Sequence, residues 1–172
     1  GVVSYPKEGI QRYSLIESDY FIAFATTAVA ASYEDWLDVG FDMIFVTGRA
    51  AFSKAATGVT EQYLADYDPL TTTTFDITAN IDVKGTSPTW LAGITLRPID
   101  NLSLGLSYRP QFNWSGTGTL DNELSPVLEN AVEIDGNSAS MTVPFPQVIR
   151  AGVQYTLGSN TLLEANLVHE AW

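Results

Sequence analysis

The chain has 172 residues, and its 20 acidic and 8 basic side chains give a formal net charge of -12. Nucleic-acid phosphates are bound by clustered lysine and arginine, so this balance argues against nucleic acid as a partner. The absence of cysteine excludes a disulfide framework and a thiolate metal site. Although 45% of the residues are hydrophobic, no apolar run approaches the roughly 20 residues of a membrane helix.

Alternation of apolar and polar residues is the main pattern along the chain. It predicts strands over about 18–33, 36–50, 72–97, 102–117, 139–157 and 161–172. Successive side chains of a strand point to opposite faces, so each segment has one apolar face and one polar face. We expect Ile77, Leu104 and Val153 on the apolar face, and Gly40, Gly93, Gly105 and Gly152 opposite the main apolar set. No segment of comparable length has a helical period, and the chain is predicted to be all-β.

The third segment contains a change of parity. Its apolar residues occupy odd positions at Ile81 and Val83 but even positions at Trp90 and Ile94. A hairpin turn at 85–88 would place two short connections in succession. A one-residue β-bulge inside a single strand gives the same change without reversing the chain. We therefore predict one long strand with a bulge.

The connections alternate in length. Short ones at 33–35, 98–101 and 158–160 are made of turn-forming residues, whereas long polar stretches cover about 51–71 and 118–138. Tight turns on one side and long loops on the other are typical of outer-membrane β-barrels. The whole chain, 1–172, is accordingly expected to form part of a single barrel domain.

Alternation by itself also fits a soluble β-sandwich, because one-sided antiparallel sheets show it too. Three features favour a barrel in lipid. Several strands run 14 or more residues, against about 5–6 in globular domains. The polar face carries charges in mid-strand, and aromatic residues lie near strand ends, as in the girdles at a membrane interface.

Several phrases of the sequence resemble the long-chain fatty acid outer-membrane transporter family (FadL-like). They are Gly9–Glu17, Ala28–Ala30, Asp35–Gly40, Leu91–Pro98, Leu102–Arg109, Pro144–Tyr155 and Leu162–Trp172. Each motif is loose, but together they cover most of the chain in the family's order.

The resemblance implies an antiparallel transmembrane β-barrel of 14 strands with an N-terminal plug; about six strands from the middle of the barrel would be present here. It implies passive uptake of hydrophobic compounds, such as long-chain fatty acids or aromatic hydrocarbons, across the bacterial outer membrane without a cofactor. Ligand would bind on the extracellular side, and a kinked strand would open a lateral route into the bilayer. The implied partners are hydrophobic small molecules, outer-membrane lipids and lipopolysaccharide.

Catalytic chemistry is not indicated. His169 is the only histidine, so a histidine-based triad and a two-histidine metal site are excluded within the chain. Asp38 and Asp42 lie four residues apart on one strand face, about 13 Å, too far to share acid–base work. We predict no enzymatic activity, no catalytic residues and no metal site.

Candidate ligand contacts are arginines on the polar face. Arg97, Arg109 and Arg150 would point into a barrel's lumen, where a carboxylate could pair with them. The alternative is that they balance lumen acids such as Asp38 and Asp82.

Two further candidates come from a loop and a proline pair. Tyr63, Leu64 and Tyr67 could form part of an apolar capture site in the first long loop. Pro144 and Pro146 remove two ladder donors, so the sheet must break or bulge there, as a gate or as a strand start. Two other functions remain open: a structural surface barrel without transport, and a soluble β-sandwich binding module.

Overall fold

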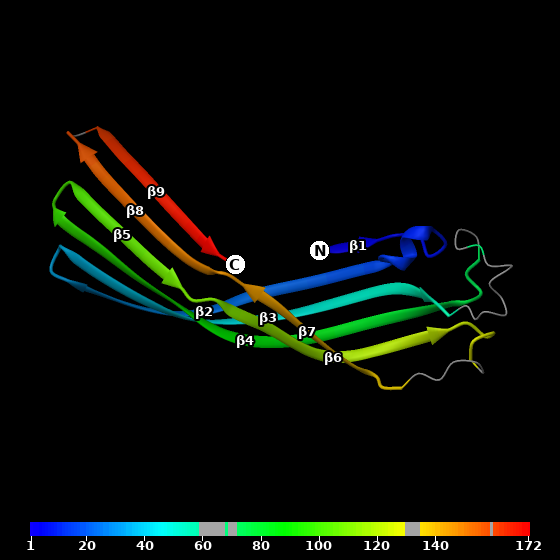
Figure 1. Ribbon diagram of the computed structural model, residues 1–172. Helices are drawn as coiled ribbons and strands as arrows, with labels where there is room; N and C mark the ends of the chain where they lie inside the picture. The colour runs from blue at the N-terminus through cyan, green and yellow to red at the C-terminus, as the bar shows by residue number, and fades with distance from the viewer. Residues whose placement is uncertain (59–67, 69–71, 130–134, 159) are drawn as a thin grey trace. The chain divides into compact units, whose positions relative to one another are not determined.

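The computed structural model describes residues 1–58, 68, 72–129, 135–158 and 160–172 (Figure 1). It consists of strands and one short 3-10 helix in these residues. In chain order the elements are β1 (Val2–Ser4), η1 (Ile10–Tyr13), β2 (Glu17–Tyr33), β3 (Leu37–Thr57), β4 (Asp76–Ile99), β5 (Leu102–Arg109), β6 (Phe112–Leu124), β7 (Ser138–Phe145), β8 (Gln147–Leu157) and β9 (Thr161–Ala171). The chain is antiparallel all-β, as predicted.

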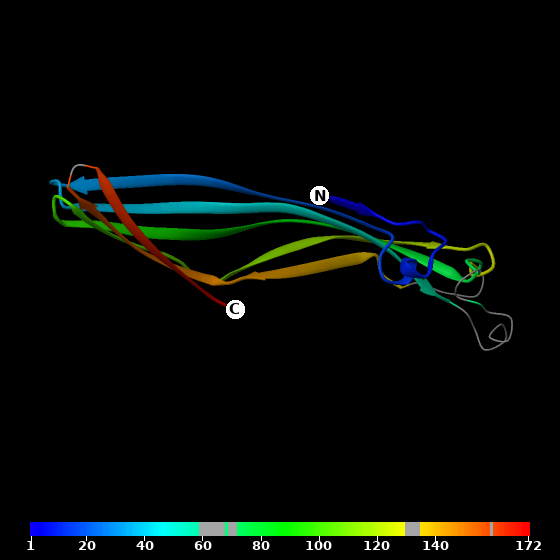
Figure 2. The same ribbon diagram turned by 90° about the horizontal axis from the view of Figure 1, so that it is seen from above.

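The chain divides into two compact units. Unit 1 comprises residues 1–22, 48–85 and 115–141, and unit 2 comprises 23–47, 86–114 and 142–172. The long strands β2, β3 and β4 contribute residues to both units, and Figure 2 shows them as continuous strands (blue to green).

The six predicted strand segments are confirmed, with three adjustments. The segment 102–117 is interrupted at 110–111, which separates β5 from β6, and the segment 139–157 is interrupted at Pro146, which separates β7 from β8. Proline lacks a backbone N–H, so it interrupts a ladder of hydrogen bonds. β3 continues to Thr57 and β6 to Leu124, so the two long connections begin later than predicted. β1 and η1 were not predicted.

In unit 2, a regular register fixes which side chains share a face. Ile94 lies opposite Leu106 on β5, Leu106 opposite Ala151 on β8, and Ala151 opposite Leu167 on β9. We call the side that they share the apolar face. Most of its large side chains in the described residues are exposed, namely Val39, Phe41, Met43, Phe45, Trp90, Ile94, Leu104, Leu106, Tyr108, Val153, Tyr155, Leu163 and Leu167, while Leu37, Leu96, Leu102 and Ile149 are half-buried.

The opposite side of unit 2 is the polar face. It carries Asp38, Asp42, Thr95, Arg97, Ser103, Ser107, Arg109, Arg150, Gln154, Glu164 and Asn166, which alternate with the residues of the apolar face. The predicted assignment of Arg97, Arg109 and Arg150 to one polar face is therefore confirmed.

In unit 1 the same alternation produces a different distribution. Ile77 lies opposite Leu124, Ile81 opposite Leu120 and Val83 opposite Gly118 across β4 and β6. The buried apolar side chains of this unit are Ile16, Ala50, Ala55, Val83 and Leu128. The other side of β4 is polar here, where Asp82 accepts two hydrogen bonds from Arg49, at 3.1 Å from Nε and 2.6 Å from Nη2.

The predicted bulge in β4 is wrong, although the prediction of one long strand is right. Val83, Ser87 and Thr89 are buried while the residues between them, Thr86 and Pro88, are exposed, so the side chains alternate without a break across 85–88. The parity change in the sequence has another cause. The side of β4 that is polar in unit 1 is apolar in unit 2, and the converse holds for the other side.

The extra residue lies in the partner strand instead. Lys84 lies opposite Thr117, and Ala92 lies opposite Tyr108. These two pairs are eight residues apart on β4, but they are nine residues apart on the partner strands, from Tyr108 of β5 to Thr117 of β6. The irregularity therefore coincides with the break at 110–111. Ile77 lies in unit 1, opposite Leu124, whereas Leu104 and Val153 lie opposite each other in unit 2.

Candidate functional site

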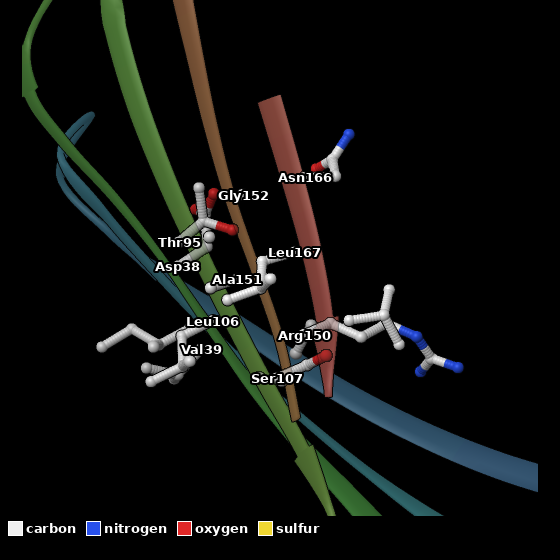
Figure 3. Close-up of a pocket in the computed structure, with 16 residues that line it drawn as sticks. Asp38, Val39, Thr95, Leu106, Ser107, Arg150, Ala151, Gly152, Asn166 and Leu167 are labelled. Carbon is white, nitrogen blue, oxygen red and sulfur yellow. The ribbon is translucent and has the colours of Figure 1, made fainter. Parts of the chain in front are cut away.

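The sheet of unit 2 lines a hollow of about 540 Å³, to which residues of both faces contribute, among them Val39, Leu106 and Leu167 (Figure 3). It extends across β3, β4, β5, β8 and β9, and the side chains that give it chemical character are Asp38, Thr95, Ser107, Arg150 and Asn166. Because these residues come from strands that are distant in sequence, the register of the sheet is what brings them together.

A band of glycines creates the hollow. Gly105 is directly opposite Gly152, and Gly40 and Gly93 line the same space. A Cβ added to Gly152 would come within 2.6 Å of Asn166 Oδ1, whereas a Cβ added to Gly105 would meet nothing within 4 Å. A larger residue at position 152 would therefore have to displace the side chain of Asn166, whereas at position 105 there is open space. The predicted placement of these glycines opposite the apolar set is confirmed.

Arg97 is paired with an acidic residue of the same face. Its Nη2 atom lies 2.5 Å from Asp38 Oδ2. The backbone N–H of Arg97 also donates to the carbonyl of Trp36, so the pair lies beside the turn between β2 and β3. This arginine balances a carboxylate, which is one of the two roles expected from the sequence.

Arg109 has a different environment. Its Nη2 atom donates one long hydrogen bond, 3.4 Å, to the carbonyl of Pro146, and its guanidinium carbon lies 5.6 Å from the centre of the Phe112 ring. Its Nε atom is buried and has no hydrogen-bond partner among the described residues. Arg150, which is exposed, forms no ion pair with any described residue.

Three phenylalanines form an aromatic cluster next to Arg109. The rings of Phe112 and Phe145 are stacked, with centres 4.8 Å apart and planes inclined by 4°. Phe24 meets Phe145 edge-on, with centres 6.5 Å apart. Phe112 begins β6 and Phe145 ends β7, so the cluster lies where the strand breaks at 110–111 and Pro146 occur. The arrangement joins an apolar surface to a cation.

A second cluster, in unit 1, surrounds the buried Arg12 of η1. Its Nε donates to Asp76 Oδ2 at 2.6 Å, Nη1 to the Gly9 carbonyl at 3.1 Å, and Nη2 to Tyr13 Oη at 2.8 Å and the Thr72 carbonyl at 3.0 Å. Tyr13 Oη donates in turn to Asp76 Oδ1 at 2.8 Å. Burial lowers the pKa of Arg12, but the hydrogen bond and charge of Asp76 outweigh it and raise the pKa above its usual value. The cluster fastens η1 to the start of β4.

No family model matches the chain, and no curated protein sequence matches it significantly. Solved structures do. The crystal structure of a Pseudomonas aeruginosa FadL homologue matches 100% of this chain with a TM-score of 0.73 and 16% identity. The CymD monoaromatic hydrocarbon channel matches 91% of it with a TM-score of 0.58 and 13% identity.

The chain has a FadL-like fold. It spans less than half of each of these proteins, 43% of the FadL homologue and 46% of CymD. The antiparallel sheet is thus the counterpart of part of a FadL-type β-barrel, as the sequence motifs had indicated. Among the described residues of this FadL-like chain, no helix is long and apolar enough to cross a membrane. The same residues contain no group of three or more His, Asp and Glu side chains arranged to hold a metal ion.

The structure places the residues predicted for the site in different environments. Arg150 lines the hollow, Arg109 lies beside the aromatic cluster, and Arg97 is paired with Asp38. The predicted break in the sheet is confirmed at Pro146, whereas Pro144 lies within β7. Their role as a gate stays a prediction. Tyr63, Leu64 and Tyr67 fall outside the described residues.

Sequence reasoning missed the aromatic cluster and the buried arginine. Phe112 and Phe145 both lie close to prolines in the sequence, which is a usable signal for a ring beside a strand break. No local signal connects Phe24 to them. Of the acids expected to balance these arginines, Asp38 pairs with Arg97, whereas Asp82 pairs with Arg49.

Proposed function

We propose that this chain is part of the wall of a bacterial outer-membrane channel for the passive uptake of hydrophobic compounds. The observation that carries the proposal is the apolar face of unit 2. Exposed apolar surface costs about 25 cal/mol per Å² in water, and a face that extends over five strands is far larger than the isolated apolar residues of soluble proteins. Contact with lipid removes this cost.

The length of the apolar stretch supports contact with a bilayer. Along β3 and the preceding turn it runs from Trp36 to Phe45, which is ten residues. A membrane-spanning strand that is tilted by roughly 45° needs about 9–11 residues. The rings of Tyr33 and Trp36 meet edge-on, 6.0 Å apart, at one end of this stretch. Paired aromatic rings at the end of an apolar band are what an interfacial girdle requires.

The hollow and the aromatic cluster support transport over a purely structural role. A structural wall requires only a filled or wetted inner surface, whereas unit 2 has both a hollow of about 540 Å³ and a stacked pair of apolar rings. The similar FadL homologue and the hydrocarbon channel CymD also support this choice. Long-chain fatty acids and aromatic hydrocarbons are the substrates that we propose, with membrane lipids and lipopolysaccharide as surrounding partners. No catalytic step is involved.

The proposal is tested by uptake. Cells that lack the gene should take up radiolabelled oleate or toluene more slowly than the parent strain, and expression of the full chain should restore the rate. If the chain instead belongs to a purely structural barrel, the deletion strain should take up both probes at the rate of the parent strain and should have an altered envelope. Unchanged uptake of both probes would contradict transport, and purification of the full chain in water without detergent would contradict the membrane location.

A further inference from the structure

Four side chains with rings form a row across the apolar face of unit 2. They are Phe41 of β3, Trp90 of β4, Tyr108 of β5 and His169 of β9, and we call them the ring row. We infer that the ring row lies at the headgroup level of the outer leaflet, where it contacts the phosphate and ester oxygens of the surrounding lipids. This inference rests on the proposed function and deepens it, because it assigns one boundary of the lipid-covered wall to particular side chains.

The sheet register and the ring contacts place these side chains at one level. Tyr108 is directly opposite Ile149, and Ile149 is directly opposite His169. The rings of Trp90 and Tyr108 meet with centres 5.7 Å apart and planes inclined by 67°. Those of Phe41 and Trp90 are stacked, with centres 6.0 Å apart. Residues directly opposite each other share a face, so the row is continuous from β3 to β9.

The apolar face ends close to the ring row, on the side away from the short turns. On β4 the next polar residue of this face beyond Trp90 is the exposed Thr86, whose hydroxyl donates to Thr47 Oγ1 of β3 at 3.1 Å. On β8 the residue of this face beyond Ile149 is Gln147. Hydroxyl and amide groups replace alkyl and aromatic side chains here, so the surroundings change from hydrocarbon to a polar medium at this level.

The height of the apolar face agrees with this boundary. On β8 the face runs from Ile149 to Leu157, eight residues further along, which is about 26 Å at a rise of about 3.3 Å per residue. A tilt of about 35–45° reduces this to a height of about 19–22 Å, close to the apolar band of outer-membrane barrels, about 25 Å. The rings of Tyr33 and Trp36 lie at the boundary beside the short turns. Short turns are periplasmic in such barrels, so the ring row faces the outer leaflet.

The chemistry of the row suits lipid headgroups. Indole, phenol and imidazole each combine an apolar ring with a hydrogen-bond donor. Trp90 is 37% exposed and Tyr108 is 36% exposed, and His169 is exposed as well, so lipid can reach all three rings. Hydrocarbon offers these donors no acceptor, which makes their burial there unfavourable. Phosphate and ester oxygens at the headgroup level accept from them while the rings stay in contact with the acyl chains.

Single cysteine variants measure the depth of the row, because the chain has no cysteine of its own. The full chain is refolded into phosphatidylcholine vesicles with a nitroxide on one introduced cysteine, and electron paramagnetic resonance measures the accessibility of the label to oxygen and to a nickel chelate. Oxygen concentrates in hydrocarbon, and the chelate stays in water. We expect the highest oxygen-to-nickel ratio at Val153→Cys, midway between Ile149 and Leu157, and the lowest at Thr86→Cys. The ratios at His169→Cys and Trp90→Cys should lie between them, several-fold below that at Val153→Cys.

Each other result overturns a defined part of the inference. A ratio at His169→Cys as high as at Val153→Cys would place the row within the hydrocarbon, and one as low as at Thr86→Cys would place it in water. Either result refutes contact with headgroups while the proposed function stands. Different ratios at His169→Cys and Trp90→Cys would show that the row does not lie at one level, and Tyr108→Cys replaces either variant if it does not fold. Low ratios at every position would show that the apolar face does not contact lipid, and the proposed function would fail as well.

Discussion

The ion pair between Arg12 and Asp76 should contribute far more to stability than the pair between Arg49 and Asp82, although the closest distance is 2.6 Å in both. The side chains of the first pair are 1% and 9% exposed, and those of the second are 49% and 35% exposed. Removal of one partner from a buried pair leaves an uncompensated charge and costs about 3–5 kcal/mol. Removal from an exposed pair costs about 0–1 kcal/mol.

Asp76 accepts hydrogen bonds from two side chains of the buried cluster, so the cost for a buried pair applies to it. Asp76→Ala removes the acceptor of Arg12 Nε and of Tyr13 Oη at once, and it leaves the guanidinium buried with only its contacts to Gly9, Thr72 and Tyr13. We expect Asp76→Ala to lower the free energy of unfolding by about 3–5 kcal/mol. Asp82→Ala, the matched control, should lower it by no more than about 1 kcal/mol.

Urea unfolding of the chain refolded into lipid vesicles measures both values. The double variant Arg12→Met with Asp76→Ala completes a cycle, and it should be more stable than the sum of the single losses predicts, because no unpaired charge remains. Equal losses in Asp76→Ala and Asp82→Ala would refute the argument from burial. A double variant whose loss is the sum of the single losses would show that the two side chains do not act as a pair.

Three further predictions concern the faces and the breaks. Gly105→Leu should slow oleate uptake with little change in stability, since a Cβ there meets nothing within 4 Å and the side chain would fill the hollow; normal uptake would show that ligand does not pass there. Leu106→Lys should destabilise the folded state in a bilayer by about 2–4 kcal/mol at mid-depth, measured against Ser107→Lys on the polar face; equal effects would place Leu106 away from lipid. Pro146→Ala restores a backbone donor at the strand break, and uptake assays should show a slower rate if the break serves as a gate.

The prediction of the elements succeeded because alternation is a local property. Each of the six strand segments was visible in its own residues. The placement of Arg97, Arg109 and Arg150 on one face followed from the alternation of polar and apolar residues alone. The strand break at Pro146 was equally local, because a missing N–H interrupts a ladder whatever the partner is.

Residues that depend on distant partners could not be found in the same way. Phe24 meets Phe145 and Arg12 meets Asp76 across long stretches of sequence, and no spacing rule connects either pair. Arg109 and Arg97 also look alike in the sequence, as basic residues near a strand end. Only the register shows that Arg97 has a carboxylate within reach and that Arg109 has an aromatic ring.

The sequence by itself determined that this chain forms long antiparallel strands with one apolar side, because the period of two follows directly from the geometry of an extended backbone. The sequence also shows the change of parity in β4 between Val83 and Trp90. Only the tertiary structure decided that β4 has no bulge there, because the alternation of buried and exposed side chains and the register with the partner strands depend on residues that are distant in the sequence.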